Sequence, residues 1–138
     1  MYPEELVSPM RADLTEVGFK EFKTSEAVSE HLENHQGTTF IVINSVCGCA
    51  AGAARPGVKM AVQKAAKKPD NFTTVFAGVD HEAVEKVREY TAPYPPSSPS
   101  MALFKDGKLI HFIERHHIEG TPAEVIGDHL VQIFDEHC

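Results

Sequence analysis

Residues 41–57 read IVINSVCGCAAGAARPG, and this stretch places two of the three cysteines of the chain at a change of secondary structure. The apolar run before Cys47 is rich in β-branched residues and shows no polar alternation, which is typical of a strand covered on both faces. The alanine-rich segment after Cys49 favours a helix. The sequence therefore predicts that both cysteines lie where a buried strand passes into a helix.

A cysteine at the start of a helix is well placed for chemistry. Unpaired backbone N–H groups and the positive end of the helix dipole stabilise the thiolate, which is the nucleophilic form. Once Cys47 has attacked a disulfide, Cys49 is near enough to displace it, because bridged residues need Cα atoms only about 4.4 to 6.8 Å apart. Gly48 has no Cβ and can take the backbone angles that so small a ring requires. We therefore expect a redox-active dithiol.

Composition and charge narrow the functional classes. A chain of 138 residues with 42% hydrophobic content suits one domain over residues 1–138. Its 13 basic and 20 acidic residues give a formal charge of −7, which opposes binding to nucleic acid or to an anionic membrane surface. The opening does not resemble a secretory signal, and no apolar run approaches the length of a membrane span. We expect a cytoplasmic protein, and in that compartment paired cysteines are more often catalytic or metal-binding than structural.

Apolar periodicity predicts alternating helices and strands along the first two thirds of the chain. Helices are expected to begin at Ser8, Thr24 and Asp80, which are residue types that cap helices. A further helix over 50–68 contains Pro56, which either begins its regular part or kinks it. Strands are expected at 19–22, 39–46 and 72–79, with the second one in the centre of the sheet.

The last third of the chain begins with a proline-rich loop. Residues 91–100 contain four prolines and no periodicity, which predicts a segment of restricted backbone freedom. The Asp-Gly pair at 106–107 separates two apolar segments and favours the positive φ angles of a tight hairpin. Thr121, Pro122 and Glu124 match a capping box with proline at the first helical position, so a final helix is expected there.

The predicted order is a helix, then βαβαβα, then a hairpin and a last helix, which indicates an α/β protein with helices on both faces of a central mixed sheet. This order resembles the thioredoxin fold with an additional N-terminal helix. Thioredoxin-like proteins carry a redox site after the second strand and a cis-proline just before the hairpin. On that resemblance Pro99 is the candidate cis-proline, with Pro93, Pro95 and Pro96 as neighbouring alternatives.

The resemblance extends to specific motifs along nearly the whole chain. They are NSVCGCAAGAARPG at 44–57, YPEELVSPMR at 2–11, PYPPSSPSMALFKDGKL at 93–109 and the C-terminal end. Together these motifs resemble the bacilliredoxin family. Its members are thioredoxin-like proteins with a Cys-Gly-Cys site, implied to remove bacillithiol from protein mixed disulfides and also discussed as disulfide isomerases.

Carried onto this sequence, the resemblance implies a thiol-disulfide oxidoreductase that needs no organic cofactor. Cys47 would act as the nucleophile toward S-thiolated proteins. Cys49 would resolve the intermediate or release the bound low-molecular-weight thiol, which is bacillithiol in this family. Gly48 and Pro99 would shape the site. The expected partners are therefore S-thiolated proteins and that thiol.

An alternative from a different class uses the same sulfurs without turnover, as a metal-binding or redox-sensing module. Two thiolates suit a soft ion such as Cu(I), whereas a closed zinc site needs four ligands. Two pairs of histidines offer further ligands, although surface solvation is their ordinary interpretation. These pairs are His31 with His35 and His116 with His117.

Four other residues near the sulfurs or at the chain end have candidate roles. Arg55 follows the cysteines by one to two helical turns and could favour the thiolate or a carboxylate on the incoming thiol, with surface solvation as the alternative. Asn44 and Ser45 could orient the loop through local hydrogen bonds. Cys138 is expected to be a mobile terminal thiol, with a resolving or intermolecular role as the alternative.

The short spacing of the cysteines predicts an easily reduced couple. A disulfide closed across a single residue is strained, and strain destabilises the oxidised form. We expect a reduction potential less negative than about −270 mV, the value for thioredoxin. Equilibration of the purified protein against glutathione buffers measures this potential, and a value below that of thioredoxin would remove the strain argument.

Overall fold

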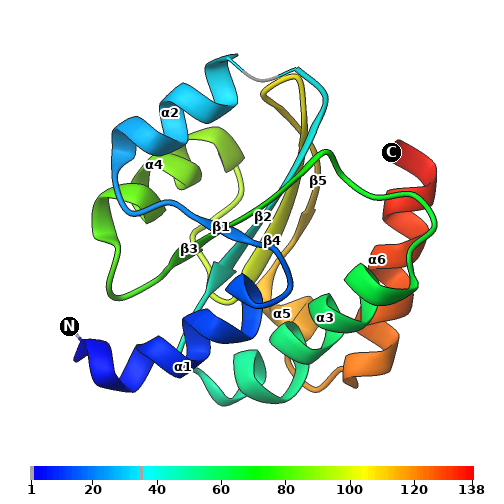
Figure 1. Ribbon diagram of the computed structural model, residues 1–138, viewed down its shortest axis with the longest axis horizontal. Helices are drawn as coiled ribbons and strands as arrows, with labels where there is room; N and C mark the ends of the chain where they lie inside the picture. The colour runs from blue at the N-terminus through cyan, green and yellow to red at the C-terminus, as the bar shows by residue number, and fades with distance from the viewer. Residues whose placement is uncertain (1, 35) are drawn as a thin grey trace.

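The computed structural model describes residues 2–34 and 36–138. Within these residues, one mixed sheet has the strand order β1-β3-β2-β4-β5 (Figure 1). β3 pairs in parallel with β1 and β2, whereas β4 runs antiparallel to both β2 and β5. The strands are β1 Lys20–Glu21, β2 Thr38–Asn44, β3 Asn71–Phe76, β4 Ser100–Lys105 and β5 Lys108–Ile113.

Helices cover both faces of this sheet, as predicted. α2 and α4 pack on one face, and α1, α3 and α6 pack on the other (Figure 1). Among the described residues, no helix combines the length and apolar character that a membrane crossing requires. The helices are α1 Glu4–Thr15, α2 Ser25–Asn34, α3 Arg55–Lys64, α4 His81–Thr91, α5 Arg115–Ile118 and α6 Ala123–His137, with a π-helical turn η1 at Ala50–Ala54.

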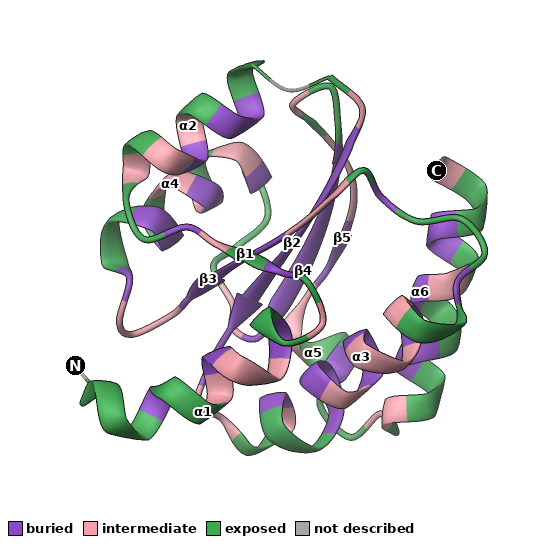
Figure 2. Cartoon of the chain, viewed as in Figure 1, coloured by how far each residue is buried: buried purple, intermediate pink, exposed green. Residues whose placement is uncertain are grey.

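The central strand β2 is buried along its whole length, which confirms the prediction of a strand covered on both faces. Its side chains alternate between two hydrophobic clusters, because successive side chains of a strand point to opposite faces. Phe40 and Val42 join the cluster beneath α3 and α6. Ile41 and Ile43 join the cluster beneath α2 and α4. Figure 2 shows the buried strands enclosed by helices whose outer faces are exposed.

The first helix begins earlier than predicted. α1 starts at Glu4, so the expected start at Ser8 was wrong. Pro3 precedes the helix in extended conformation, and the acidic residues of the first turn complement the positive end of the helix dipole. Pro9 therefore lies inside the helix, where it supplies no backbone N–H to the preceding turn.

Asp80 precedes α4, but its side chain does not cap that helix as predicted. Its carboxylate instead accepts two hydrogen bonds from the Arg11 guanidinium, at 2.9 and 3.0 Å. Both side chains are buried, and the hydrogen bonding with Asp80 raises the pKa of Arg11. This ion pair fastens α1 to the start of α4.

The other predicted caps have mixed outcomes. The Thr24 hydroxyl accepts a hydrogen bond from the Ala27 N–H at 3.1 Å, which confirms it as the cap of α2. The capping box at Thr121 was wrong, because α6 begins one residue later with Pro122 at its cap position. The Thr121 hydroxyl donates back to the His117 carbonyl at 2.9 Å, since the preceding short helix α5 brings that carbonyl close.

Two predicted backbone features are confirmed. Pro56 lies in the first turn of α3 and so begins the regular helix rather than kinking it. Asp106 and Gly107 have φ angles of 52° and 80° and form the tight turn between β4 and β5. Only residues that tolerate the left-handed region fit such a turn.

Gly57 allows α3 and α6 to pack closely together. A Cβ built at Gly57 would lie 2.8 Å from Ile126 Cγ2 and 3.1 Å from the Ala123 carbonyl oxygen. At Gly52, in η1, an added Cβ would meet nothing within 4 Å. These two glycines form a matched pair, because one is crowded and the other is open.

We expect Gly57→Ala to lower the free energy of unfolding by about 1 to 3 kcal/mol, because an added methyl group overpacks the helix contact. Gly52→Ala should raise it by about 0.5 to 1 kcal/mol, because alanine leaves the unfolded chain less conformational freedom. Urea unfolding monitored by circular dichroism measures both changes. Equal effects of the two substitutions would contradict the close packing at Gly57.

Candidate functional site

The two cysteines lie at the carboxyl end of β2, in the loop that leads into η1. The Asn44 side-chain oxygen accepts a hydrogen bond from the Ser45 N–H at 2.9 Å. The Ser45 hydroxyl in turn accepts one from the Cys47 N–H at 3.0 Å. These bonds confirm that Asn44 and Ser45 orient the loop, so the position of Cys47 is set from the end of the central strand.

The sulfurs of Cys47 and Cys49 face each other at 2.6 Å, and both are free thiols of intermediate exposure. The Cys49 N–H also points at Cys47 Sγ, at 3.4 Å. The Cys47 carbonyl accepts hydrogen bonds from the N–H groups of Ala50 and Ala51, at 3.0 and 3.2 Å. A turn of helical backbone thus holds the two sulfurs together.

Gly48 is exposed, and it does not use the wider choice of backbone angles that a glycine allows, because its φ is not positive. Gly48 and Cys49 already belong to the helical turn, so the short ring needs no unusual φ angle. A Cβ at Gly48 would meet nothing within 4 Å. The missing side chain therefore leaves the surface beside the sulfurs open.

Cys47 opens into a cleft of about 280 Å³. The walls come from five separate segments of the chain, and Cys49 does not line them. Tyr2 lies over Gly78, because a Cβ there would come within 2.8 Å of the tyrosine ring. The lining residues are Tyr2, Ser45, Val46, Cys47, Ala77, Gly78, Ser98 and Arg115.

Pro99 lies next to this cleft. The Ser98–Pro99 peptide bond is cis, and Pro99 is buried while Ser98 lines the cleft with Cys47. The Ala92–Pro93 bond is also cis. Of these two prolines, Pro99 is the one whose neighbour borders the cysteines.

Arg115, at the start of α5, is a site residue that the sequence analysis missed. Its Nη1 donates to the Ser98 carbonyl at 3.2 Å, and its Nε donates to Glu119 Oε1 at 2.6 Å. β4 runs antiparallel to both β2 and β5, so β2 and β5 run in the same direction. Their carboxyl ends therefore lie at the same end of the sheet. That topology was the available signal, since it brings the residue after β5 beside the cysteines.

Arg55 does not act where the sequence analysis expected. Its side chain is buried under the loop, where Nη1 donates to Asn44 Oδ1 at 3.0 Å and to the Ser45 carbonyl at 2.8 Å. Its Nε donates to Asp13 Oδ2 at 3.2 Å. Arg55 therefore supports the loop from below, and Arg115 is the cation whose charge reaches the thiols.

The surroundings separate the acidities of the two thiols. The pKa of Cys47 is lowered most by a hydrogen bond from the Cys49 thiol. Burial is the next largest effect and raises this pKa, whereas the N–H groups of Cys49 and Ala50 and the charge of Arg115 lower it further. Burial raises the pKa of Cys49, and the neighbouring Cys47 raises it further. As pH rises, Cys47 is therefore the first of the pair to become a thiolate.

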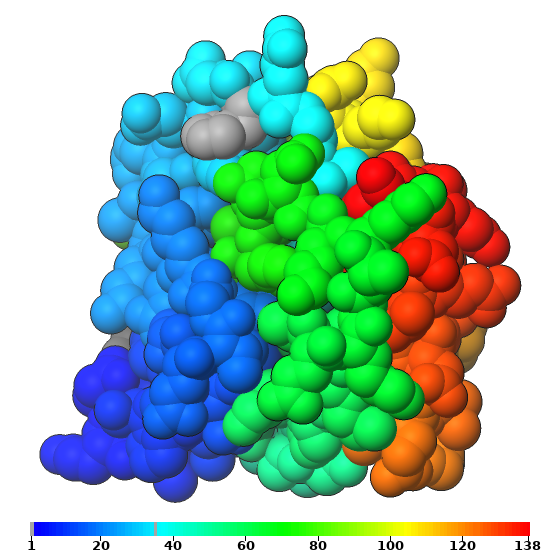
Figure 3. Space-filling model, turned by 45° about the vertical axis from the view of Figure 1, so that its right-hand side comes forward, coloured from blue at the N-terminus to red at the C-terminus, as the bar shows by residue number. Residues whose placement is uncertain are grey.

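Cys138 lies at the opposite end of the sheet from this cleft. Its thiol interacts with Thr38 at the amino end of β2, and burial raises its pKa. In Figure 3 the C-terminal end borders the segment that leads into β3. The length of β2, roughly 20 Å at 3.3 Å per residue, separates Cys138 from the loop of Cys47. A resolving role for Cys138 within one chain does not fit this separation.

Within the described part of the chain, no histidine considered as an additional ligand forms a ligand cluster with the sulfurs. His31 is buried, with Nε2 3.0 Å from Thr39 Oγ1 near the amino end of β2. His35 lies outside the described residues. His116 and His117 lie on α5 with their rings close together, the centroids 4.1 Å apart. A Cys47 thiol of lowered pKa that lines a cleft, with a Cys49 thiol of raised pKa facing it, suits disulfide exchange.

The family described as disulphide isomerase matches residues 2–138 of the chain. A bacilliredoxin of Cytophaga hutchinsonii is 60% identical over 99% of this chain and 99% of its own length. A bacilliredoxin of Bacillus cereus is 53% identical over 99% of this chain and 95% of its own length.

Solved structures of low sequence identity share the fold. A putative oxidoreductase with a thioredoxin fold is 13% identical with a TM-score of 0.58, covering 86% of this chain and 96% of that chain. Oxidised thioredoxin from Plasmodium falciparum is 13% identical with a TM-score of 0.59, covering 85% and 99%. These likenesses confirm the predicted thioredoxin-like fold.

We expect Cys49→Ala to raise the pKa of Cys47, because it removes the hydrogen bond that lowers this pKa most. Cys49→Ser keeps an O–H donor and should raise the pKa less. The pH dependence of alkylation by iodoacetamide reports the thiolate, and a Cys138→Ser background leaves Cys47 as the reacting sulfur. A pKa in Cys49→Ala that is unchanged or lower would contradict this account of the thiolate.

Proposed function

Because this chain belongs to the disulphide isomerase family, in which the bacilliredoxins are found, we propose that it reduces protein mixed disulfides formed with a low-molecular-weight thiol. We propose bacillithiol as that thiol and the cytoplasm as the compartment, because a reducing environment keeps both cysteines in the active dithiol form. The observation that carries the proposal is a thiol of lowered pKa, Cys47, facing a cleft with the Cys49 thiol directly behind it.

In the first step, the Cys47 thiolate attacks the sulfur of the low-molecular-weight thiol in the mixed disulfide, and the substrate protein's thiolate is the leaving group. The original S–S bond breaks, a new S–S bond forms to Cys47, and the departing thiolate takes a proton from water. Two features support Cys47 as the nucleophile: it lines the cleft, and its pKa is the lowered one of the pair.

In the second step, Cys49 loses its proton and attacks the Cys47 sulfur. The low-molecular-weight thiol leaves, and a disulfide forms between Cys47 and Cys49. Two electrons and two protons from an external reductant then restore both thiols. The facing sulfurs support this resolving role for Cys49.

The cleft suits a small thiol in size and charge. Its volume of about 280 Å³ is near the lower end of small-molecule pockets. Arg115 supplies the positive charge on its wall, and a guanidinium binds carboxylates well. We therefore assign Arg115 the recognition of a carboxylate on the incoming thiol.

Disulfide isomerisation is a second candidate function, favoured by the description of the family. The raised pKa of Cys49 supports it, because a protonated resolving thiol slows release of the mixed disulfide on Cys47. A longer-lived mixed disulfide gives a substrate protein time to rearrange its own cysteines.

The central test mixes a protein S-thiolated with bacillithiol, or with glutathione, with the wild type and each single Cys→Ser variant, followed by mass spectrometry. The wild type should release the thiol with turnover when reductant is present. Cys49→Ser should accumulate a mixed disulfide on Cys47, and Cys47→Ser should release nothing. Cys138→Ser should behave as the wild type, because Cys138 lies at the far end of the sheet.

Three outcomes would contradict parts of this proposal. Accumulation of the adduct in Cys47→Ser rather than in Cys49→Ser would reverse the two roles. Equal rates of release of bacillithiol and of glutathione from the S-thiolated proteins would remove the proposed preference for bacillithiol. Release of thiol only once, despite added reductant, would favour the non-enzymatic sensing module.

A further inference from the structure

A second feature, away from the cysteines, is a pair of histidines that face each other. His111 of β5 and His129 of α6 point their Nε2 atoms at one another across 3.3 Å. With His117 they line a cavity of about 470 Å³. This cavity shares no lining residue with the cleft of Cys47. The disulfide chemistry proposed above leaves both histidines without a role.

The distance between the two nitrogens matches a shared metal ion. Zinc binds imidazole nitrogen at about 2.0 to 2.1 Å, and two tetrahedral ligands at that distance lie about 3.3 to 3.4 Å apart. A direct N–H···N bond would be long at 3.3 Å, since protein hydrogen bonds from N–H groups are usually about 2.9 to 3.0 Å. The spacing thus suits a bridging cation better than a shared proton.

We propose that His111 and His129 bind a divalent transition-metal ion, with zinc as the best match. The two imidazoles would be the protein ligands, with water in the remaining coordination positions. Imidazole nitrogen is a favoured ligand of zinc, copper and nickel. The ion would join β5 to α6, which are separate elements of the fold.

The environment of His111 supports binding of a metal cation. Burial lowers the pKa of His111, and the neighbouring His129, His137 and His117 lower it further. A lowered pKa favours the neutral ring, which is the form that binds a metal ion. Glu136 contributes a nearby negative charge that opposes the lowering of this pKa and favours a cation.

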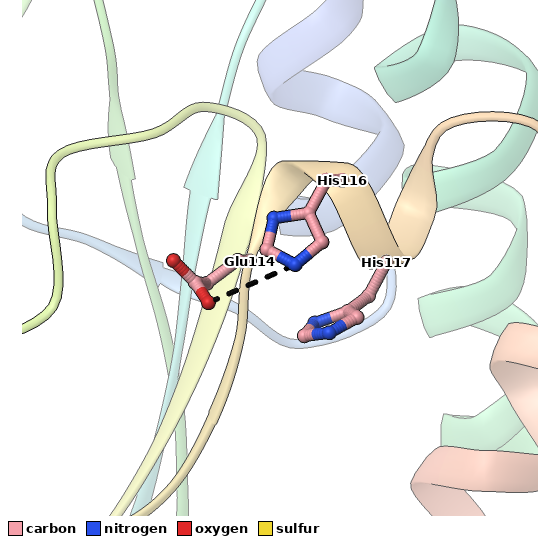
Figure 4. A group of neighbouring side chains, drawn as sticks. All are labelled: Glu114, His116 and His117. Atoms are coloured by element: carbon pink, nitrogen blue, oxygen red, sulfur yellow. Dashed lines mark ion pairs between the residues drawn. The ribbon is translucent and has the colours of Figure 1, made fainter.

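A neighbouring group on α5 is the competing location for an ion. Ligand atoms of Glu114, His116 and His117 lie within 4.8 Å of one another. Figure 4 shows His116 directed toward Glu114, with their ion-pair atoms 3.9 Å apart. The His116 side chain is 67% exposed, and all three residues come from one short stretch of chain. His111 and His129 are preferred because they come from two separate elements and their Nε2 atoms lie at the spacing of two zinc ligands.

The test uses the untagged full-length chain with Cys47→Ser, Cys49→Ser and Cys138→Ser, so that thiolates cannot contribute ligands. Zn²⁺ binding is measured by isothermal titration calorimetry. We expect a single Zn²⁺ per chain, and we expect His111→Gln and His129→Gln each to weaken it by about tenfold or more. His116→Gln tests the group on α5, and His81→Gln, at an exposed position on α4, is the matched control.

A second measurement needs no histidine substitution. Co²⁺ added to the same thiol-free chain should broaden or shift the NMR ring signals of His111 and His129 before those of the other histidines. The proposal is overturned if Zn²⁺ binding is lost in His116→Gln but kept in His129→Gln. It is also overturned if His81→Gln weakens binding as much as His129→Gln does, or if the Co²⁺ effects appear first elsewhere.

Discussion

The site depends on one buried cation. Arg55 bonds Asn44 and the Ser45 carbonyl at the end of β2, and its Nε reaches Asp13 on α1. A guanidinium that is only 3% exposed is stable there because polar partners surround it, and removal of those partners would leave an unpaired charge in the interior. The same Asn44 then orders the Ser45 backbone that directs Cys47. The loop of the thiols is thus supported by packing and charge together.

Two arginines near the thiols have different roles. Arg55 fixes the loop from within the fold, whereas Arg115 places its charge on the open side, next to the cleft. The fold brings Arg115 there because β2 and β5 end at the same edge of the sheet. The asymmetry between the lowered pKa of Cys47 and the raised pKa of Cys49 follows from their different hydrogen bonds and burial. In the proposed cycle both steps need a thiolate, so this asymmetry sets their order: Cys47 is the first sulfur to ionise, and Cys49 must lose its proton before it can release the mixed disulfide.

Structural features that depend only on residues close together in the sequence were predictable. The β2 strand, the Cys-Gly-Cys turn, the Asp-Gly hairpin and the Thr24 cap each depend on neighbouring residues. Features that depend on distant partners were not predictable in this way. Asp80 binds Arg11 from 69 positions away, and this partner replaces the local cap that its sequence context favours. Arg115, and the pairing of His111 with His129, likewise arise only when β5 and α6 take their places in the fold.

The ion pair between α1 and Asp80 places the N-terminal end of the chain at the rim of the cleft. Tyr2 covers Gly78 at the rim, and it is carried by a helix that Arg11 ties to Asp80. A purification tag fused before Tyr2 would therefore emerge at the entrance of the Cys47 cleft. Substrate access measured with such a fusion reflects the appended peptide as well as the native entrance, and a tag at the other end of the chain leaves that entrance clear.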